Sequence, residues 1–289
     1  MVRRAFTLVE LLVVLAILLV VAGVLFPVFA AAKARALSTQ CASQFKQVSQ
    51  ATLIYTDDYD QRYMPINHQV GGTPSSENDR TWVQLLLPYR PGFDQFFCPE
   101  NQTGKSAISS TFDADLVAGD TSSRYYTASQ KVNLGYNFQY LSPVVRERTG
   151  WAARTRSQFD VQSSATTILF VDSAVQDAET GQVTGGSWLV VPPCRYSADS
   201  IGRAVDTFTG SSAGNTEVYT PSRGWEGGSE NVEFRYGGAW TWHAGRMTVA
   251  MLDGSVRSFS PGDLTRGCNF QANWQGFIQN SAVYKWDLN

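Results

Sequence analysis

The chain contains four cysteines, which could form disulfides, bind a metal or act as nucleophiles. They are Cys41, Cys98, Cys194 and Cys268. They lie far apart with no C-x-x-C spacing, and only two histidines accompany them. Zinc sites usually draw on closely spaced cysteine or histidine pairs, so we predict no metal site and no other cofactor. In an exported domain the cysteines would form disulfides, and four of them allow three pairing schemes.

One cysteine pairing follows from the pattern of apolar residues. Cys41 lies on the apolar stripe of a helical segment, and Cys98 ends an apolar run that should return to that helix. We therefore predict a Cys41–Cys98 disulfide, with Cys194–Cys268 as the second pair.

Three clustered acids, Asp57, Asp58 and Asp60, form a weak candidate for a calcium site. Asp also favours turns and helix ends, and this is the stronger interpretation. No nucleophile, base and orienting acid group together, so we predict no catalytic residues and no enzyme. Gly210–Gly214 matches G-x-S-x-G, but the apolar strand and the helix that should flank a nucleophile elbow are missing.

The overall charge argues against a nucleic-acid partner. The formal net charge of the 289-residue chain is −2, so no general field would attract a polyanion. Eight Trp and twelve Tyr, together with frequent Gly, suit a loop-rich β domain outside the cytosol.

The first half of a long helical pattern is strongly apolar. The run from Leu11 to Ala32 carries no charge and would span ~33 Å as a helix, about the thickness of a bilayer core. Arg3 and Arg4 before it favour a cytoplasmic N-terminus. An ordinary secretory signal would have a shorter apolar core and a cleavage site after it.

The helical pattern continues past this run. Apolar residues recur at steps of three and four, at Leu37, Cys41, Phe45, Val48, Thr52 and Tyr55. We predict one helix from about Phe6 to about Thr56, kinked or loosened at Pro27. Further on, 163–172 is the clearest strand, and 197–228, rich in Gly, Ser and Thr, is predicted as long loops.

Glu10 is an acid at the start of the apolar run, where acids are usually functional. The basic leader, Phe6, Glu10 and the apolar helix together resemble the N-terminal signal of type IV pilins and of type II secretion pseudopilins. The resemblance implies cleavage between Ala5 and Phe6, N-methylation of Phe6 and a role for Glu10 in assembly. Ala5 departs from that family, which nearly always has Gly there.

A second pattern lies near the C-terminus. Met247–Leu252 and Ser255–Ser260 are apolar-rich segments joined by Asp253-Gly254, which predicts a hairpin over 246–260 with a type I′ turn. His243, nine residues and then Asp-Gly also resembles the tail of a large prepilin-like bacterial family. His243 is a candidate ligand or base, but we favour a structural role in which it packs beside the hairpin and bonds the backbone or Asp253.

The fold implied is α+β and pilin-like, with a long N-terminal helix packed on an antiparallel β-sheet with loop insertions. Residues 1–5 would be a leader, 6–32 the transmembrane or filament-core half of the helix, and 33–289 an exported globular domain. The expected partners are the prepilin peptidase/methyltransferase, other pilin-like subunits or copies of the chain, and the inner membrane. The chain would be a single-pass inner-membrane protein with its domain outside the cytoplasm, or part of an extracellular filament.

Two functions stay open at this stage. The first is a structural subunit of a type IV pilus-like or type II secretion filament. The second is a membrane-tethered binding module for carbohydrate, which would stack sugars on exposed tryptophans: Trp151, Trp225, Trp240 and Trp274.

Overall fold

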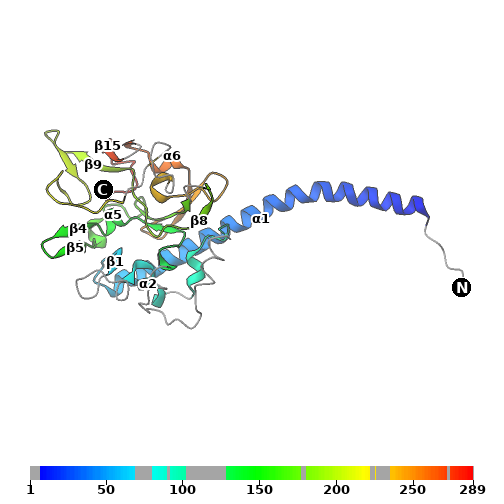
Figure 1. The fold of residues 1–289 in the computed structure, drawn as a ribbon, viewed down its shortest axis with the longest axis horizontal. Helices are drawn as coiled ribbons and strands as arrows, with labels where there is room; N and C mark the ends of the chain where they lie inside the picture. Colours follow the sequence, from blue (N-terminus) through cyan, green and yellow to red (C-terminus); the bar gives the residue numbers. More distant parts are fainter. Residues whose placement is uncertain are drawn as a thin grey trace. The chain divides into compact units, whose positions relative to one another are not determined.

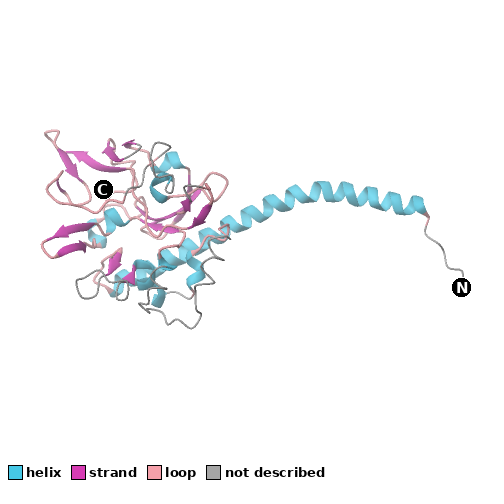
Figure 2. Ribbon diagram, viewed as in Figure 1, coloured by secondary structure: helices cyan, strands magenta, loops and turns pink. Residues whose placement is uncertain are grey.

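The computed structural model describes residues 7–68, 80–89, 92–101, 128–176, 180–221, 225, 235–271 and 274–288. The chain divides into two compact units, Met1–Gln40 and Cys41–Asn289. One long helix, α1 (Leu8–Asp58), runs through both, whereas the strands all belong to the second unit (Figures 1 and 2). This α+β arrangement confirms the predicted fold class and the predicted helix to within two residues at either end.

In the first unit, α1 exposes its apolar side chains. The large apolar residues between Leu8 and Phe29 are about half to three-quarters exposed. Pro27 lies inside the helix, which continues through it as one element, and the predicted kink or loosening there stays a prediction. Among the described residues, α1 is the one helix that is long and apolar enough to cross a membrane.

In the second unit, the same helix contributes one face to a core. Its fully buried side chains include Cys41, Phe45 and Val48, in agreement with the predicted stripe. Ser49 and Thr52 are buried too, and each donates its hydroxyl to the carbonyl one turn earlier, at Phe45 and Val48. These bonds satisfy the hydroxyls inside the helix, so the buried face needs no other polar partner at these two positions.

A four-stranded antiparallel sheet has the order β13-β12-β6-β3. Its strands are β3 (Leu134–Tyr136), β6 (Ile168–Asp172), β12 (Met247–Met251) and β13 (Val256–Phe259). Phe170 lies opposite Ala250, and both join the apolar cluster that contains α1. Val171 lies opposite Val249, and both join a second apolar cluster. Because β6 and β12 are covered on both faces, every residue in them is buried.

The second sheet corrects the prediction of long loops over 197–228. It has five strands in the order β11-β10-β9-β15-β14. They are β9 (Cys194–Ala198), β10 (Ala204–Asp206), β11 (Ser211–Ser212), β14 (Cys268–Gln271) and β15 (Trp274–Ile278). Strands β9 and β15 pair in parallel, so this sheet is mixed. Gly- and Ser-rich segments lack the apolar alternation by which strands are recognised, although their backbones pair normally.

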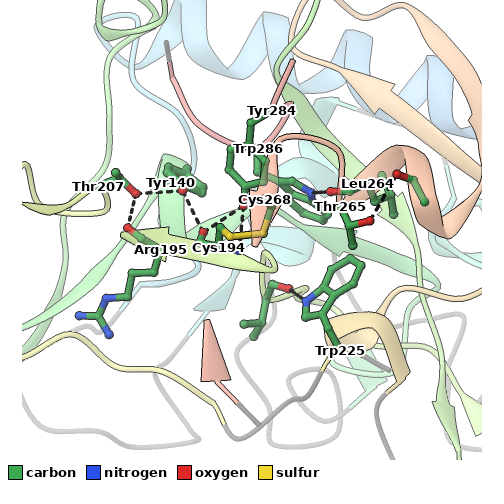
Figure 3. The surroundings of a disulfide bond; sticks show 12 residues. Tyr140, Cys194, Arg195, Thr207, Trp225, Leu264, Thr265, Cys268, Tyr284 and Trp286 are labelled. Carbon is green, nitrogen blue, oxygen red and sulfur yellow. Dashed lines mark hydrogen bonds between the residues drawn. A yellow bond between two sulfur atoms is a disulfide. The ribbon is translucent and has the colours of Figure 1, made fainter. Parts of the chain in front are cut away.

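The predicted Cys194–Cys268 disulfide is confirmed. The two cysteines open β9 and β14, which flank β15, so the bond ties together both neighbours of one strand. Tyr140 and Tyr284 surround it and both donate a hydroxyl to the Cys194 carbonyl (Figure 3).

The remaining elements are short. The helices are α2 (Trp82–Leu86), α5 (Phe138–Leu141) and α6 (Pro261–Leu264), and the 3₁₀ turns are η1 (Leu87–Tyr89), η2 (Phe93–Phe96), η3 (Gln158–Asp160) and η4 (Arg235–Gly238). Three two-stranded ladders pair β1 (Asn67–His68) with β2 (Arg80–Thr81), β4 (Val144–Glu147) with β5 (Gly150–Ala153), and β7 (Val175–Gln176) with β8 (Val183–Gly185).

The predicted C-terminal hairpin is present as β12 and β13, but its turn is of another type. Gly254 has a φ of +77°, whereas Asp253 is not among the residues with positive φ. Gly254 N–H donates to the Met251 carbonyl, and Met251 N–H donates to Ser255. This is a three-residue loop with Gly in the left-handed position. A type I′ turn, which needs positive φ at both central residues, is therefore wrong here.

We expect Gly254→Val to lower the free energy of unfolding by about 1 kcal/mol or more, because a β-branched residue is strained at this φ. Gly262→Val is the matched control. Gly262 lies in α6 without a positive φ, so the change should be nearly neutral. Thermal unfolding of both variants makes the comparison, and equal melting would contradict the assigned turn.

The disulfide gives a second expectation. It joins residues 74 positions apart, which corresponds to about 4 kcal/mol in the chain-entropy model. Replacing Cys194 and Cys268 together by Ser should remove stability of that order in denaturant titrations. Non-reducing peptide mapping of the unmodified chain should yield the Cys194–Cys268 peptide. Its absence from oxidised protein would refute the pairing.

Candidate functional site

The start of α1 is closed by a reciprocal cap. Glu10 Oε2 accepts hydrogen bonds from the Thr7 backbone N–H at 2.9 Å and from the Thr7 hydroxyl at 2.7 Å. The Thr7 hydroxyl in turn accepts from the Glu10 N–H at 3.3 Å. This is a capping box, which the spacing Thr-x-x-Glu signals and which our sequence analysis missed. Ala5 and Phe6 lie outside the described residues.

A second group of reactive side chains lies buried in the globular unit. Cys41, Cys98, Asp172 and His243 place their ligand-type atoms within 4.8 Å of one another. Cys41 comes from α1, Cys98 follows η2, Asp172 ends β6, and His243 precedes β12. Four separate segments thus converge on one point, and the exposed fractions are 0–1% for the first three residues and 9% for His243. We call these four residues the buried cluster.

Three contacts join the members of the buried cluster in the order Cys41, Asp172, His243 and Cys98. The Cys41 thiol donates to Asp172 Oδ1 at 3.4 Å. The other carboxylate oxygen, Oδ2, lies 3.5 Å from His243 Nε2. That same nitrogen lies 3.9 Å from Cys98 Sγ.

The predicted Cys41–Cys98 disulfide is wrong. Both cysteines are free thiols in the structure, although they do lie side by side as predicted. Each sulfur also lies beside a polar side chain: the Cys41 thiol donates to the carboxyl group of Asp172, and Cys98 Sγ lies 3.9 Å from Nε2 of His243. The apolar pattern revealed the proximity of the two sulfurs but not these partners.

Cys98 and Asp172 are held by a shared support. Asn133 Oδ1 accepts from the Cys98 N–H at 3.0 Å, and its Nδ2 donates to the Ser173 carbonyl at 3.0 Å. Asn133 therefore fixes the segment that carries Cys98 against the end of β6. Asp172 Oδ2 also accepts the backbone N–H of Thr248 on β12, which orients the carboxylate.

His243 is aimed by a tight turn. The His243 and Arg246 backbones exchange both hydrogen bonds, at 3.1 and 3.0 Å. Ala244 and Gly245 between them have φ values of +49° and +80°. This is the pattern of a type I′ turn, so the turn that we predicted at Asp253-Gly254 lies instead immediately after His243.

The second ring nitrogen of His243 has an acidic partner. Nδ1 lies 3.1 Å from Glu100 Oε1. The predicted partner, Asp253, is instead in the hairpin turn, where its Oδ1 accepts from the Ser255 N–H. His243 therefore does more than pack beside the hairpin, because both nitrogens of its ring contact polar side chains, one in the buried cluster and one on Glu100.

The cluster shifts the protonation of its members. Burial raises the pKa of Asp172 to about 8, and the nearby Cys98 adds to this. A hydrogen bond with Cys41 lowers the pKa of Cys98 to about 6 in spite of its burial, while the same bond and burial raise the pKa of Cys41. Burial of His243 opposes its charged form, but contacts with Cys98 and Asp172 outweigh this and raise its pKa to about 9. These shifts favour the charged forms of Cys98 and His243 and the neutral forms of Asp172 and Cys41.

Other candidates from the sequence lie elsewhere. Within the part of the chain that the structure describes, the buried cluster is the one convergent group of His, Cys, Asp or Glu ligands. The calcium candidates Asp57, Asp58 and Asp60 do not form such a group, and Asp57 accepts from Gln61. Asp253 and Gly254 do not reach the cluster, and Gly254 instead accepts a hydrogen bond from Lys46 of α1 at 2.7 Å.

Comparison with known proteins identifies one part of the chain. Residues 1–26 match the family described as the prokaryotic N-terminal methylation motif. No curated protein and no solved structure matches the chain. The matched region contains the leader, Glu10 and most of the exposed apolar helix, so the chain carries a prepilin-type N-terminal signal.

We expect Ala244→Asn to raise the free energy of unfolding by about 1 kcal/mol, because Asn tolerates the left-handed conformation better than Ala and Asn-Gly favours a type I′ turn. Gly245→Ala in the same turn should have the opposite effect, since it adds a Cβ at φ +80°. Thermal unfolding of the two variants measures both. A destabilised Ala244→Asn would show that the turn is not of this type.

Proposed function

We propose that this protein is a pilin-like structural subunit that prepilin peptidase processes and that assembles into a type IV pilus-like or type II secretion filament. The observation that carries the proposal is the match of residues 1–26 to the methylation motif. The motif coincides with a helix whose apolar surface is left uncovered in the single chain.

The exposed apolar surface in the N-terminal part of α1 must be covered by lipid or by protein. At ~25 cal/mol per Å² of apolar surface, a helix turn with several exposed Leu, Val and Phe side chains is strongly unfavourable in water. Before assembly, lipid in the bilayer covers the apolar surface of the helix. After assembly, the helices of neighbouring subunits cover it. The mechanism is therefore transfer of one apolar surface from lipid to neighbouring subunits, not catalysis.

Glu10 is suited to pair with a neighbour while it caps its own helix. Thr7 occupies Oε2, whereas a carboxylate has about four acceptor sites in all. Cleavage before Phe6 creates a new amine. In a staggered array, the amine of an incoming subunit would meet the Glu10 carboxylate of the one before it, relieving two charges in an apolar surrounding. This contact would set the axial register between subunits.

This function places the chain in the inner membrane first, with the unit Cys41–Asn289 outside the cytoplasm, and in the cell envelope or an extracellular filament later. Its partners are the prepilin peptidase/methyltransferase and other pilin-like subunits or copies of the chain. The basic leader, Arg3-Arg4, favours this orientation.

The carbohydrate-binding alternative gains no specific support. Trp225 is 2% exposed and donates to the Val191 carbonyl, so it is a core residue and offers no stacking surface. Trp151 is half-buried, and its ring is already in edge contact with Tyr219.

The test separates the charge of Glu10 from its capping role. Gln at this position can still accept the Thr7 hydrogen bonds of a capping box, so Glu10→Gln removes the charge alone. Thr7→Val is the matched control, because it removes the hydroxyl cap and keeps the charge. We expect both variants to be cleaved and inserted, and only Glu10→Gln to lose filaments.

Three measurements decide the outcome. Intact mass should show a chain that begins at Phe6 and carries one methyl group, membrane fractionation should show retention, and imaging of the cell envelope should show filaments labelled through the globular unit. Normal filaments from Glu10→Gln would refute the charge pairing. Absence of filaments from the unmodified chain while the assembly machinery is active would overturn the proposed function.

A further inference from the structure

The ligand-type atoms of the buried cluster lie within about 1 Å of the edge lengths of a metal-centred tetrahedron. Zinc binds sulfur at ~2.3 Å and nitrogen or oxygen at ~2.0–2.2 Å, so neighbouring ligand atoms in a tetrahedral site lie about 3.3–3.8 Å apart. Cys41 Sγ lies 3.4 Å from Asp172 Oδ1, and His243 Nε2 lies 3.5 Å from Asp172 Oδ2 and 3.9 Å from Cys98 Sγ. With one ligand atom taken from each residue, all four atoms lie within 4.8 Å of one another. The three printed contacts lie within a few tenths of an ångström of such edges, and a separation at the 4.8 Å limit would shorten by about 1 Å when the ion binds.

The four donors also have the surroundings of a closed site. All are buried, and His243 presents Nε2 to the cluster while Nδ1 faces Glu100. A carboxylate on the far nitrogen of a metal-bound histidine is a common support, because it fixes the ring and its tautomer. Hydrogen bonds also position two other members of the cluster. Asn133 accepts the backbone N–H of Cys98, and Asp172 accepts the backbone N–H of Thr248.

We propose that Cys41 Sγ, Cys98 Sγ, Asp172 and His243 Nε2 bind one Zn²⁺ ion in a structural, four-coordinate site. All four positions are filled by the protein, so the ion has no open position for a substrate. This departs from the expectation of no metal, which rested on the lack of C-x-x-C spacing. Cys98 and His243 are 145 positions apart, so no local motif signals the site.

The donor set selects zinc among the common metals. Two sulfurs exclude calcium and magnesium, which take oxygen ligands. Copper(I) prefers sulfur-only sets, whereas zinc accepts sulfur, nitrogen and carboxylate oxygen together. Zinc also has no redox chemistry, which suits a site without access for substrate.

Charge and protons balance in the proposed site. The ion binds both sulfurs as thiolates, Asp172 as a carboxylate and His243 as a neutral ring with its proton on Nδ1 toward Glu100. Protons displaced from the ligand atoms pass to solvent. The metal centre then carries one net negative charge, and backbone N–H groups face it: Thr248 donates to Asp172 and Glu100 donates to Cys98.

The proposal is tested on the full-length chain in detergent, purified under reducing conditions and then dialysed against buffer with trace zinc. Elemental analysis should give one zinc per chain, and native mass spectrometry should show the same addition. Replacement of zinc by Co²⁺ should produce a thiolate-to-cobalt charge-transfer band and the visible bands of tetrahedral cobalt. These measurements need no variant, so a folding defect cannot obscure them.

Variants assign the ligands. Cys98→Ser and His243→Gln should each weaken zinc retention against a chelator at least tenfold, and Glu100→Gln, which keeps all four ligands, should weaken it ~10–100-fold. The double replacement of Cys194 and Cys268 by Ser is the thiol control. Asp206→Asn, a buried acid paired with Arg195 outside the cluster, is the carboxylate control. Both controls should retain zinc like the unmodified chain.

Three results would overturn the site. The first is unmodified chain that keeps no zinc and shows no cobalt–thiolate band. The second is a mapped Cys41–Cys98 disulfide in the metal-free chain isolated from the cell envelope without added reductant. The third is zinc that Cys98→Ser and His243→Gln retain as firmly as the two controls do. Filament formation is measured separately, so loss of the metal site leaves the proposed assembly function standing.

Discussion

The Asp172 carboxylate is the constraint on which the globular unit depends. It is completely buried at the end of β6, where an unpaired charge would be very costly. Its partners come from different elements: the Cys41 thiol from α1, the Thr248 N–H from β12, and the His243 ring from the turn before β12. Satisfying this one acid therefore requires the helix, the central strands and the turn to adopt their positions together.

The fold explains the nine-residue spacing between His243 and Asp253-Gly254. The intervening residues contain β12, so the histidine and the glycine lie at opposite ends of one strand. At one end, His243 contacts Asp172, which binds Cys41 of α1. At the other, the Gly254 carbonyl accepts from Lys46 of the same helix. The two ends of β12 thus hold α1 against the sheet at two points, and the fixed spacing between His243 and Gly254 sets the distance between these points.

Features with a local signal were predictable from the sequence, whereas most features made by distant contacts were not; the Cys194–Cys268 disulfide, whose cysteines are 74 positions apart, is an exception. The periodicity of α1, the β-branched run of β6 and the Asp-Gly hairpin each depend on neighbouring residues. The strands β10 and β11 carry no apolar alternation, so only their pairing partners define them. The buried cluster was missed for a similar reason. Cys41 and Asp172 are 131 positions apart, and Asp172 looked like an ordinary acid that stops a strand. Proximity of Cys41 and Cys98 was inferred correctly, but the acid and the histidine between them decide their chemistry.

The hydroxyls of Ser49 and Thr52 bond within α1, and this affects how the helix bears a mechanical load. Because Ser49 and Thr52 donate their hydroxyls to carbonyls of the helix itself, these two donors do not link the helix to the sheet. Sliding is opposed instead by Cys41 and Lys46, which form directional bonds to the end of β6 and to the hairpin turn. Both residues lie at the start of the globular unit, so shear along the helix axis would reach them before the rest of the core. The helix can thus act as a tether, and its bonds to β6 and to the hairpin turn are made near its first turns in the domain.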